Sequence, residues 1–121
     1  MDEHQTVNIR DEGDVTLARM EVRNLARTLG MDPADQARIS LAASASVRAL
    51  GWRGAHERQM TIECVYAEGR KGLRVVCSRP DSDQSQLAQQ SLNEAKWMVD
   101  ELTVKQLATN VMQITLIKWV A

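Results

Sequence analysis

The chain carries few histidines and cysteines, which enzymes often use for acid–base or metal chemistry. Its two histidines, His4 and His56, are far apart in the sequence, and both lie in polar segments. No cysteine or carboxylate stands at a metal-ligand spacing from either histidine, so we interpret both as solvated surface residues. Asp81 and Asp83 form a carboxylate pair in a segment rich in serine and glutamine, which is typical of a solvated loop. The sequence therefore predicts no metal site.

The serines and cysteines offer no recognisable nucleophile. Ser44 and Ser46 lie in a helical pattern without a base partner, and their surroundings do not resemble the sharp turn that exposes a catalytic serine. Cys64 and Cys77 lie in separate apolar segments, and a disulfide framework normally needs more cysteines. We expect both to be buried free thiols in a reducing compartment.

Three arginines are spaced so that they share one side of a helix. Arg19, Arg23 and Arg27 follow one another at intervals of four residues. Two interpretations are open: an ordinary solvated helix face, which the pattern alone favours, and a docking strip for an acidic protein surface. Trp97 also stands out, because it lies beside Lys96 and off the main apolar stripe of its predicted helix.

The elements that position these residues follow from the apolar pattern. Residues 6–10 alternate and predict a first strand. Apolar residues at helical spacing over 15–29 predict an amphipathic helix that ends at Gly30. A second helix is predicted to begin with Asp32 as its N-cap and Pro33 as its first residue.

The second half of the chain predicts a hairpin, a helix and two strands. Residues 60–66 and 73–77 alternate on either side of a glycine-containing turn, which is typical of a hairpin. Apolar positions within 87–102 predict a third helix. Two final strands are predicted at 104–107 and 112–120. The order β-α-α-β-β-α-β-β predicts an α/β two-layer sandwich, a mixed sheet with its helices on one face.

Composition restricts the classes of function. The 121 residues fit one domain covering 1–121, and 44% hydrophobic residues supply a core without disulfides or metal. The net charge of −1 predicts no affinity for nucleic acid or an anionic membrane. No apolar run approaches the roughly 18 residues of a membrane helix, and the polar, acidic N-terminus is unlike a signal peptide. We therefore expect a cytoplasmic protein.

Several segments together resemble one known family. DVTLARMEVRNLARTLGMDPADQARISLAAS, at 14–44, resembles the opening of the anti-sigma-factor and stressosome switch serine kinases, the RsbT- and RsbW-like members of the GHKL (Bergerat-fold) ATPases. EGRKGLRVV, at 68–76, resembles their central hairpin. MVDELTV and ITLIKWV resemble their last helix and last strand. The resemblance spans nearly the whole chain and implies a GHKL, histidine-kinase-like ATPase fold.

The same resemblance allows the family's catalytic positions to be inspected. Family members carry a Glu and an Asn one turn apart on the second helix, where the Glu acts on the attacking group and the Asn holds magnesium. At the matching positions this chain has Ala45 and Ala49, whereas Arg48 agrees with the family pattern. Methyl groups cannot ligate a hard cation, which requires oxygen ligands.

Two further parts of the family's nucleotide site are missing. The adenine-binding Asp-x-Gly-x-Gly loop corresponds to residues 77–83, which contain no glycine. No glycine follows Gly72, so the glycine-rich lid that presents backbone N–H groups to phosphate is absent, and we expect a reduced lid region. The sequence therefore predicts a degenerate, pseudokinase-like domain with no catalytic residue, no cofactor and no metal.

The resemblance implies that such a domain acts by binding proteins. Family kinases bind a sulfate-transporter-type antagonist domain, a sigma factor or a phosphatase regulatory domain in bacterial partner-switching and stress-response pathways. We predict a non-catalytic regulator of this kind; the alternative is an active serine kinase with an unorthodox site. Arg19, Arg23 and Arg27 are the candidate interface, and Trp97 either covers the gap left by the lid or is an exposed interface anchor. Whether the chain forms a homodimer stays open.

Overall fold

The computed structural model describes residues 4–51, 58–80, 86–107 and 110–121. In chain order its elements are β1 (His4–Ile9), α1 (Glu12–Thr28), α2 (Pro33–Leu50), β2 (Arg58–Ala67), β3 (Arg70–Pro80), α3 (Gln89–Trp97), β4 (Glu101–Leu107) and β5 (Val111–Trp119). The predicted order of strands and helices is confirmed.

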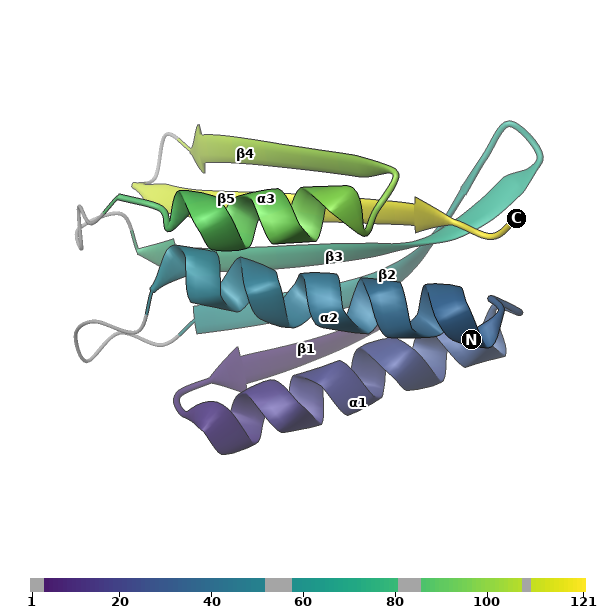
Figure 1. Ribbon diagram of the computed structural model, residues 1–121, viewed down its shortest axis with the longest axis horizontal. Helices are drawn as coiled ribbons and strands as arrows, with labels where there is room; N and C mark the ends of the chain where they lie inside the picture. The colour runs from purple at the N-terminus through teal and green to yellow at the C-terminus, as the bar shows by residue number, and fades with distance from the viewer. Residues whose placement is uncertain (1–3, 52–57, 81–85, 108–109) are drawn as a thin grey trace.

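The strands form one five-stranded sheet in the order β1-β2-β3-β5-β4 (Figure 1). All four neighbouring pairs are antiparallel, so the prediction of a mixed sheet is wrong. β3 and β4 do run in the same direction, as expected of strands joined through a crossover helix. β5 lies between them, however, and each strand therefore has only antiparallel neighbours.

The helices cover one face of the sheet, and the core lies between the two layers (Figure 1). On β3 the side chains of Leu73, Val75 and Cys77 are buried, and on β5 those of Ile114 and Leu116. Alternate strand residues therefore face the helices, and the predicted two-layer sandwich is confirmed. No helix within the described ranges is long and apolar enough to cross a membrane.

The other face of the sheet has no helix over it in the described part of the chain. A row of β-branched side chains crosses this face on all five strands, because the strand registers place its members opposite one another. In sheet order the members are Thr6, Thr61, Val76, Thr115 and Thr103. Such residues suit a half-exposed pleated surface. The open face is therefore partly exposed and mostly polar.

The start of α2 and the end of α1 agree with the sequence prediction, whereas α1 begins at Glu12, three residues before the predicted helical pattern. Asp32 is the N-cap of α2, and its carboxylate accepts a hydrogen bond from the Asp35 amide at 2.8 Å. Asp11 caps α1 in the same way, since its carboxylate accepts from the Asp14 amide at 3.0 Å. Gly30 follows α1 with a φ of 93°, a left-handed conformation that favours glycine. Local chemistry thus determines both helix boundaries.

The third helix is shorter than predicted, because α3 ends at Trp97 and Leu102 belongs to β4. The helical spacing of apolar residues continues past the true end of the helix. Beyond that end, the Asp100 amide donates to the Ile117 carbonyl at 3.0 Å, and Leu102 pairs with Leu116. Pairing with β5 therefore outweighs the helical pattern at the end of this segment.

Candidate functional site

The two alanines at the family's catalytic positions are enclosed in the helical layer. The exposed fraction is 0% for Ala45 and 1% for Ala49. α2 packs against both α1 and α3. The Ala49 carbonyl accepts a hydrogen bond from the Ala88 amide at 2.9 Å, and Arg48 reaches Glu94 of α3 at 3.6 Å. The segment that leads into α3 is therefore held directly against the last turn of α2.

Neither alanine lines any of the four main hollows on the described surface. The hollow with the largest volume, about 730 Å³, lies where the first turn of α2 approaches the end of β5. His56, Asp81 and Asp83 lie outside the described residues. Within the described ranges, no three His, Cys, Asp or Glu side chains are close enough to hold a metal ion.

Sequence reasoning missed two arginines that are buried at the C-terminal end of α2. Arg58 and Arg79 are each 2% exposed. Arg58 Nε donates to the Gly51 carbonyl at 2.9 Å, and Arg79 Nη1 donates to the Leu50 carbonyl. A helix leaves its last carbonyls without intrahelical partners, and its C-terminal end is electronegative. The two guanidinium groups therefore satisfy and neutralise the end of α2.

A signal for these buried arginines was present in the alternation of the strands. Arg58 stands two residues before the buried Met60, and Arg79 stands two residues after the buried Cys77. Side chains two positions apart point to the same face of a strand. Both arginines therefore face the helices, although arginine is rarely buried without a partner.

The N-terminal end of α2 is joined to β5 by an ion pair. Asp35 accepts a hydrogen bond from Arg38 at 2.9 Å and lies 3.4 Å from Lys118 Nζ. Burial alone would raise the pKa of Asp35, but the hydrogen bond from Arg38 and the charge of Lys118 outweigh it and hold that pKa below its ordinary value. Asp35 and Lys118 line the hollow of about 730 Å³ together with other charged residues, and we assign their ion pair a structural role.

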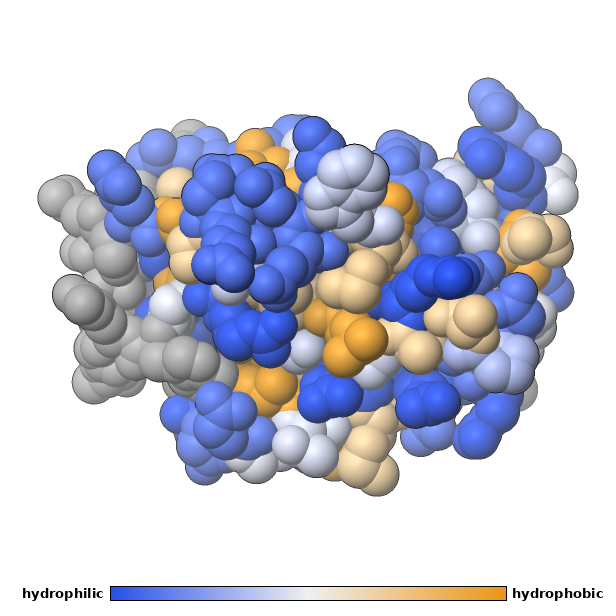
Figure 2. Space-filling view, viewed as in Figure 1, coloured by the Kyte–Doolittle hydropathy of each residue, from blue (hydrophilic) through white to orange (hydrophobic). Residues whose placement is uncertain are grey.

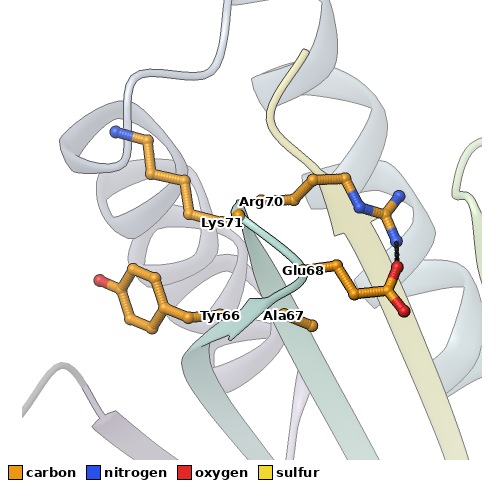
Figure 3. Close-up of a pocket in the computed structure, with 6 residues that line it drawn as sticks. Tyr66, Ala67, Glu68, Arg70 and Lys71 are labelled. Carbon is orange, nitrogen blue, oxygen red and sulfur yellow. Dashed lines mark ion pairs between the residues drawn. The ribbon is translucent and has the colours of Figure 1, made fainter.

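A second hollow lies at the tip of the β2–β3 hairpin, shown in Figure 3. Glu68 and Arg70 form an ion pair of 4.0 Å on one side of it, and Tyr66 and Lys71 extend on the other (Figure 3). Every residue that lines it is exposed. Binding sites normally combine apolar walls with a few converging polar groups, and this surface lacks enclosed walls.

The arginine stripe is solvent-exposed along α1, as the sequence predicts. Arg19, Arg23 and Arg27 are all exposed, and Arg27 Nη2 donates to Asn24 Oδ1 at 3.0 Å. The structure therefore places three cationic side chains on the outside of the helical layer. This exposure is compatible with both an ordinary solvated helix face and a docking strip, so the docking role stays a prediction.

Apolar side chains are exposed on the same helical layer. Trp97 is 88% exposed at the end of α3. Leu17 and Met20 of α1 and Leu41 of α2 are 48%, 56% and 44% exposed. Figure 2 shows this face, with apolar atoms among the charged ones over α1 and α2. Trp97 is therefore a projecting side chain, and its role at an interface stays a prediction.

The serine and cysteine side chains considered as nucleophiles make structural contacts or are buried. Ser44 donates to the Leu41 carbonyl and Ser46 to the Ala42 carbonyl, each at 3.0 Å. Cys77 is a buried free thiol, and burial raises its pKa to about 12, which disfavours the reactive thiolate. Cys64 is only partly buried, so the expectation that both thiols are buried is wrong for this residue.

Comparison with known proteins relates this geometry to a family. No protein-family model matches the chain. It is 38% identical over 76 residues to the serine/threonine-protein kinase RsbT of Bacillus subtilis (strain 168); these residues are 63% of this chain and 56% of the kinase, so the similarity spans little more than half of that relative. The fold is similar to the crystal structure of the RsbU and RsbW domains of Rv1364c from Mycobacterium tuberculosis, with a TM-score of 0.64 and 17% identity over 94% of this chain and 32% of that one. Sequence and fold together thus confirm the resemblance of this chain to the RsbT- and RsbW-like kinases of the GHKL family.

Proposed function

We propose that the chain is a non-catalytic, pseudokinase-like regulator that acts by binding protein partners in a bacterial partner-switching pathway. The observation that carries the proposal is the enclosure of Ala45 and Ala49 in the helical layer. Where related kinases present a carboxylate and an amide to nucleotide and magnesium, this chain presents two buried methyl groups. Hard cations need oxygen ligands, which these side chains do not supply.

The hydrogen bond between Ala88 and Ala49 supports the same proposal. This bond holds the segment before α3 against the last turn of α2. That turn carries Ala49, which matches the position of the magnesium ligand in the related kinases. A phosphate cradle at a helix N-terminus also needs free backbone N–H groups. Here the amide of Ala88, the N-cap residue of α3, donates to α2.

We further propose that partners bind to the outer surface of the helical layer. Arginine, methionine and tryptophan are enriched in the centre of protein interfaces. This layer exposes Arg19 and Arg23, the apolar Met20 and Leu41, and Trp97. The matching partner surface is acidic and partly apolar. An antagonist-type domain, a sigma factor and a phosphatase regulatory domain are the candidate partners.

A nucleotide titration tests the proposal against its alternative. Only a ligand that binds the native state raises the melting temperature. We expect ATP with Mg²⁺ to leave the melting temperature and the tryptophan fluorescence unchanged. The 38% identity to a serine/threonine-protein kinase favours the alternative, an active kinase. A saturable shift at micromolar ATP, together with phosphoryl transfer to one of the candidate partners, would establish that alternative.

A binding experiment tests the partner surface. Each candidate partner is titrated against the wild-type chain, Trp97→Ala and the matched control Tyr66→Ala, which removes an aromatic residue that is 66% exposed on the hairpin. Truncation of an interface anchor weakens binding by roughly 30-fold, whereas residues outside the interface have little effect. We expect loss only with Trp97→Ala. Equal affinities of the three proteins for a bound partner would contradict the assignment.

A further inference from the structure

β4 forms one edge of the sheet and is open along its outer side. It pairs with β5 on its inner side, and no other described strand follows it (Figure 1). Most of the strand is exposed to solvent, and the exposed fraction is 37% for both Val104 and Leu107. An edge strand presents unpaired backbone donors and acceptors to any strand that approaches it. The edge can therefore accept a further strand.

The side chains of β4 divide by chemistry between the two faces of the sheet. Glu101, Thr103 and Lys105 stand opposite β5 residues of the open face, so they lie on that face. Leu102 and Val104 stand opposite the buried Leu116 and Ile114, so they lie on the helix side. From Glu101 to Lys105 the strand is thus acidic, hydroxylic and basic on the open face and aliphatic on the helix side.

We infer that β4 pairs antiparallel with β4 of a second copy of this chain, about a two-fold axis perpendicular to the sheet and midway between the Thr103 residues of the two copies. In this register Glu101 stands opposite the partner's Lys105, and the symmetric pair forms on the other side of the axis. Leu102 stands opposite the partner's Val104 on the helix side. Opposite charges and apolar pairs that face one another across strands are favourable. Both faces of the edge are therefore self-complementary.

Neighbouring registers lack this complementarity. An axis at Val104 places Glu101 opposite the partner's Leu107 and removes the opposite-charge pair. An axis at Lys105 places two ammonium groups opposite each other, which is destabilising. If the register shifts by one residue, side chains of the helix side stand opposite side chains of the open face, and the two faces of the sheet no longer continue into the second copy. Thr103 is therefore the centre that the charges and the apolar residues select together.

The open face of the sheet supports the same arrangement. The β-branched row that crosses all five strands ends at Thr103. A two-fold axis at this residue continues the row without interruption into the second copy and forms one ten-stranded sheet. Such a strand edge buries less than the roughly 1,200 Å² of a standard stable interface, so we expect a weak dimer that depends on concentration.

The dimer is independent of the proposed function, since its surface is the sheet edge and its partner is the same chain. Sedimentation velocity on the full chain, from low micromolar to near-millimolar concentration, measures it. We expect a monomer–dimer equilibrium in the wild-type chain. Lys105→Glu sets two carboxylates opposite each other and should weaken dimerisation by about tenfold. Lys71→Glu, a reversal at an exposed residue of β3, is the matched control and should leave it unchanged.

Charge exchange tests the register itself. Glu101→Lys alone should weaken dimerisation as Lys105→Glu does, and an equimolar mixture of the two variants should restore it, because each then faces its opposite charge. Glu101 Oε2 also accepts from Trp119 Nε1 at 3.1 Å, so the melting temperature of each variant is measured in parallel. A monomeric wild-type chain at every concentration, or a mixture that fails to recover, would overturn the inference.

A cross-link provides a test that does not alter the charges. Cysteines placed at Thr103 of both copies would lie directly opposite each other, with Cβ atoms about 5 Å apart. Thr103→Cys should therefore form a disulfide-linked dimer under copper–phenanthroline oxidation. Leu107→Cys, on the same edge but far from the axis, should form little. Equal cross-linking of the two variants would contradict the proposed axis.

Discussion

Ala45 and Ala49 are enclosed so completely that a larger polar side chain at either position must be accommodated inside the helical layer. A buried carboxylate without a partner loses its hydration and gains little in return. The surroundings of these alanines therefore oppose the side chains that a kinase requires. Restoring the family's two residues does not restore the space around them.

We therefore predict that Ala45→Glu combined with Ala49→Asn fails to create a nucleotide site. The double variant should be less stable than the wild-type chain by roughly 1–3 kcal/mol, because a carboxylate is buried without a partner. It should show no ATP binding, because the sequence has no glycine after Gly72 from which a phosphate-binding lid could form. Chemical denaturation and an ATP titration measure the two results.

The control is Leu41→Glu, which places a carboxylate on the exposed side of the same helix, where the leucine is 44% exposed. Surface substitutions usually change stability by less than about 0.5 kcal/mol. Recovered ATP binding with unchanged stability in the double variant would show that the pocket persists.

The lowered pKa of Asp35 predicts a pH-dependent stability. A carboxyl group whose pKa is lower in the folded chain than its ordinary 3.8 stabilises the fold above that pH, and the contribution is lost as the pH falls through the folded-state pKa. Asp35→Asn should cost about 1 kcal/mol at neutral pH, since Lys118 loses its partner. The difference from the wild-type chain should disappear at strongly acidic pH.

Denaturation curves at neutral and acidic pH measure this difference. Glu68→Gln is the control, because Glu68 is 86% exposed in its side chain and its contact with Arg70 is long. Exposed pairs of this kind contribute little. A stability difference for Asp35→Asn that is the same at every pH would contradict the proposed ionic contribution.

At the scale of elements, α2 is the central helix of the layer and depends on charges at both of its ends. Asp32 and Asp35 stand at its N-terminal end, and Arg58 and Arg79 at its C-terminal end. Negative groups at the start of a helix and positive groups at its end interact favourably with the helix dipole. The position of α2 over the sheet is therefore determined by strand residues as well as by its apolar side.

We predict that Arg79→Met lowers the free energy of unfolding by about 2–3 kcal/mol, because a buried carbonyl at the end of α2 loses a charged donor. Urea denaturation followed by far-UV circular dichroism measures the loss. Arg70→Met is the control: its guanidinium lies 4.3 Å above the Trp119 ring but is exposed, so its removal should cost much less. Equal losses for both variants would contradict the capping role.

The arginine stripe of α1 leads to a kinetic prediction. Arg19→Glu combined with Arg23→Glu should slow association with an acidic partner, most clearly at low salt, because exposed charges act mainly by steering. Stability should change little, since exposed charges contribute little to folding. Stopped-flow association at several salt concentrations measures the effect. Association rates equal to those of the wild-type chain would identify the stripe as an ordinary solvated face.

The elements that the sequence predicts well are those determined by local chemistry. Asp32, Pro33 and Gly30 mark helix boundaries through their own backbone and side-chain preferences, and the structure agrees. Leu102 was assigned to a helix because its spacing fits one, yet it pairs with Leu116. Strand pairing depends on residues distant in sequence, and neither the antiparallel order nor the end of α3 follows from a local pattern.

The candidate site also combines features that the local sequence predicts with features that depend on contacts between distant residues. The sequence alone shows that Ala45 and Ala49 carry no side chain that can bind a metal ion. The burial of Arg58 and Arg79 depends on where the end of α2 meets the sheet, so the sequence analysis did not identify these two residues. The exposure of Trp97 likewise depends on what packs beside α3.

At the scale of the whole molecule, the helices join all five strands into one core. α1 contacts β1, β2 and β3, α2 contacts β3 and β5, and α3 contacts α2 and β4. β3 lies in the middle of the sheet and receives both of the longer helices. The helical face and the β4 edge are the two surfaces that we propose for partners. They lie on different parts of the described structure, so use of one does not exclude use of the other.

This architecture predicts a gradient of stability across the sheet that hydrogen exchange can measure. Amides of β3 are hydrogen-bonded between two strands and lie beside the buried Leu73 and Val75, so they should exchange only when the whole domain unfolds. Amides of β4 lie at an exposed edge and should exchange through local opening, much faster, in dilute protein. If β4 pairs with a second copy, raising the protein concentration should slow exchange at alternate amides of β4, those that point outward, and leave β3 unchanged. Protection of β4 equal to that of β3 in dilute protein would show that the edge is covered within a single chain, which would contradict the open β4 edge on which the proposed dimer depends.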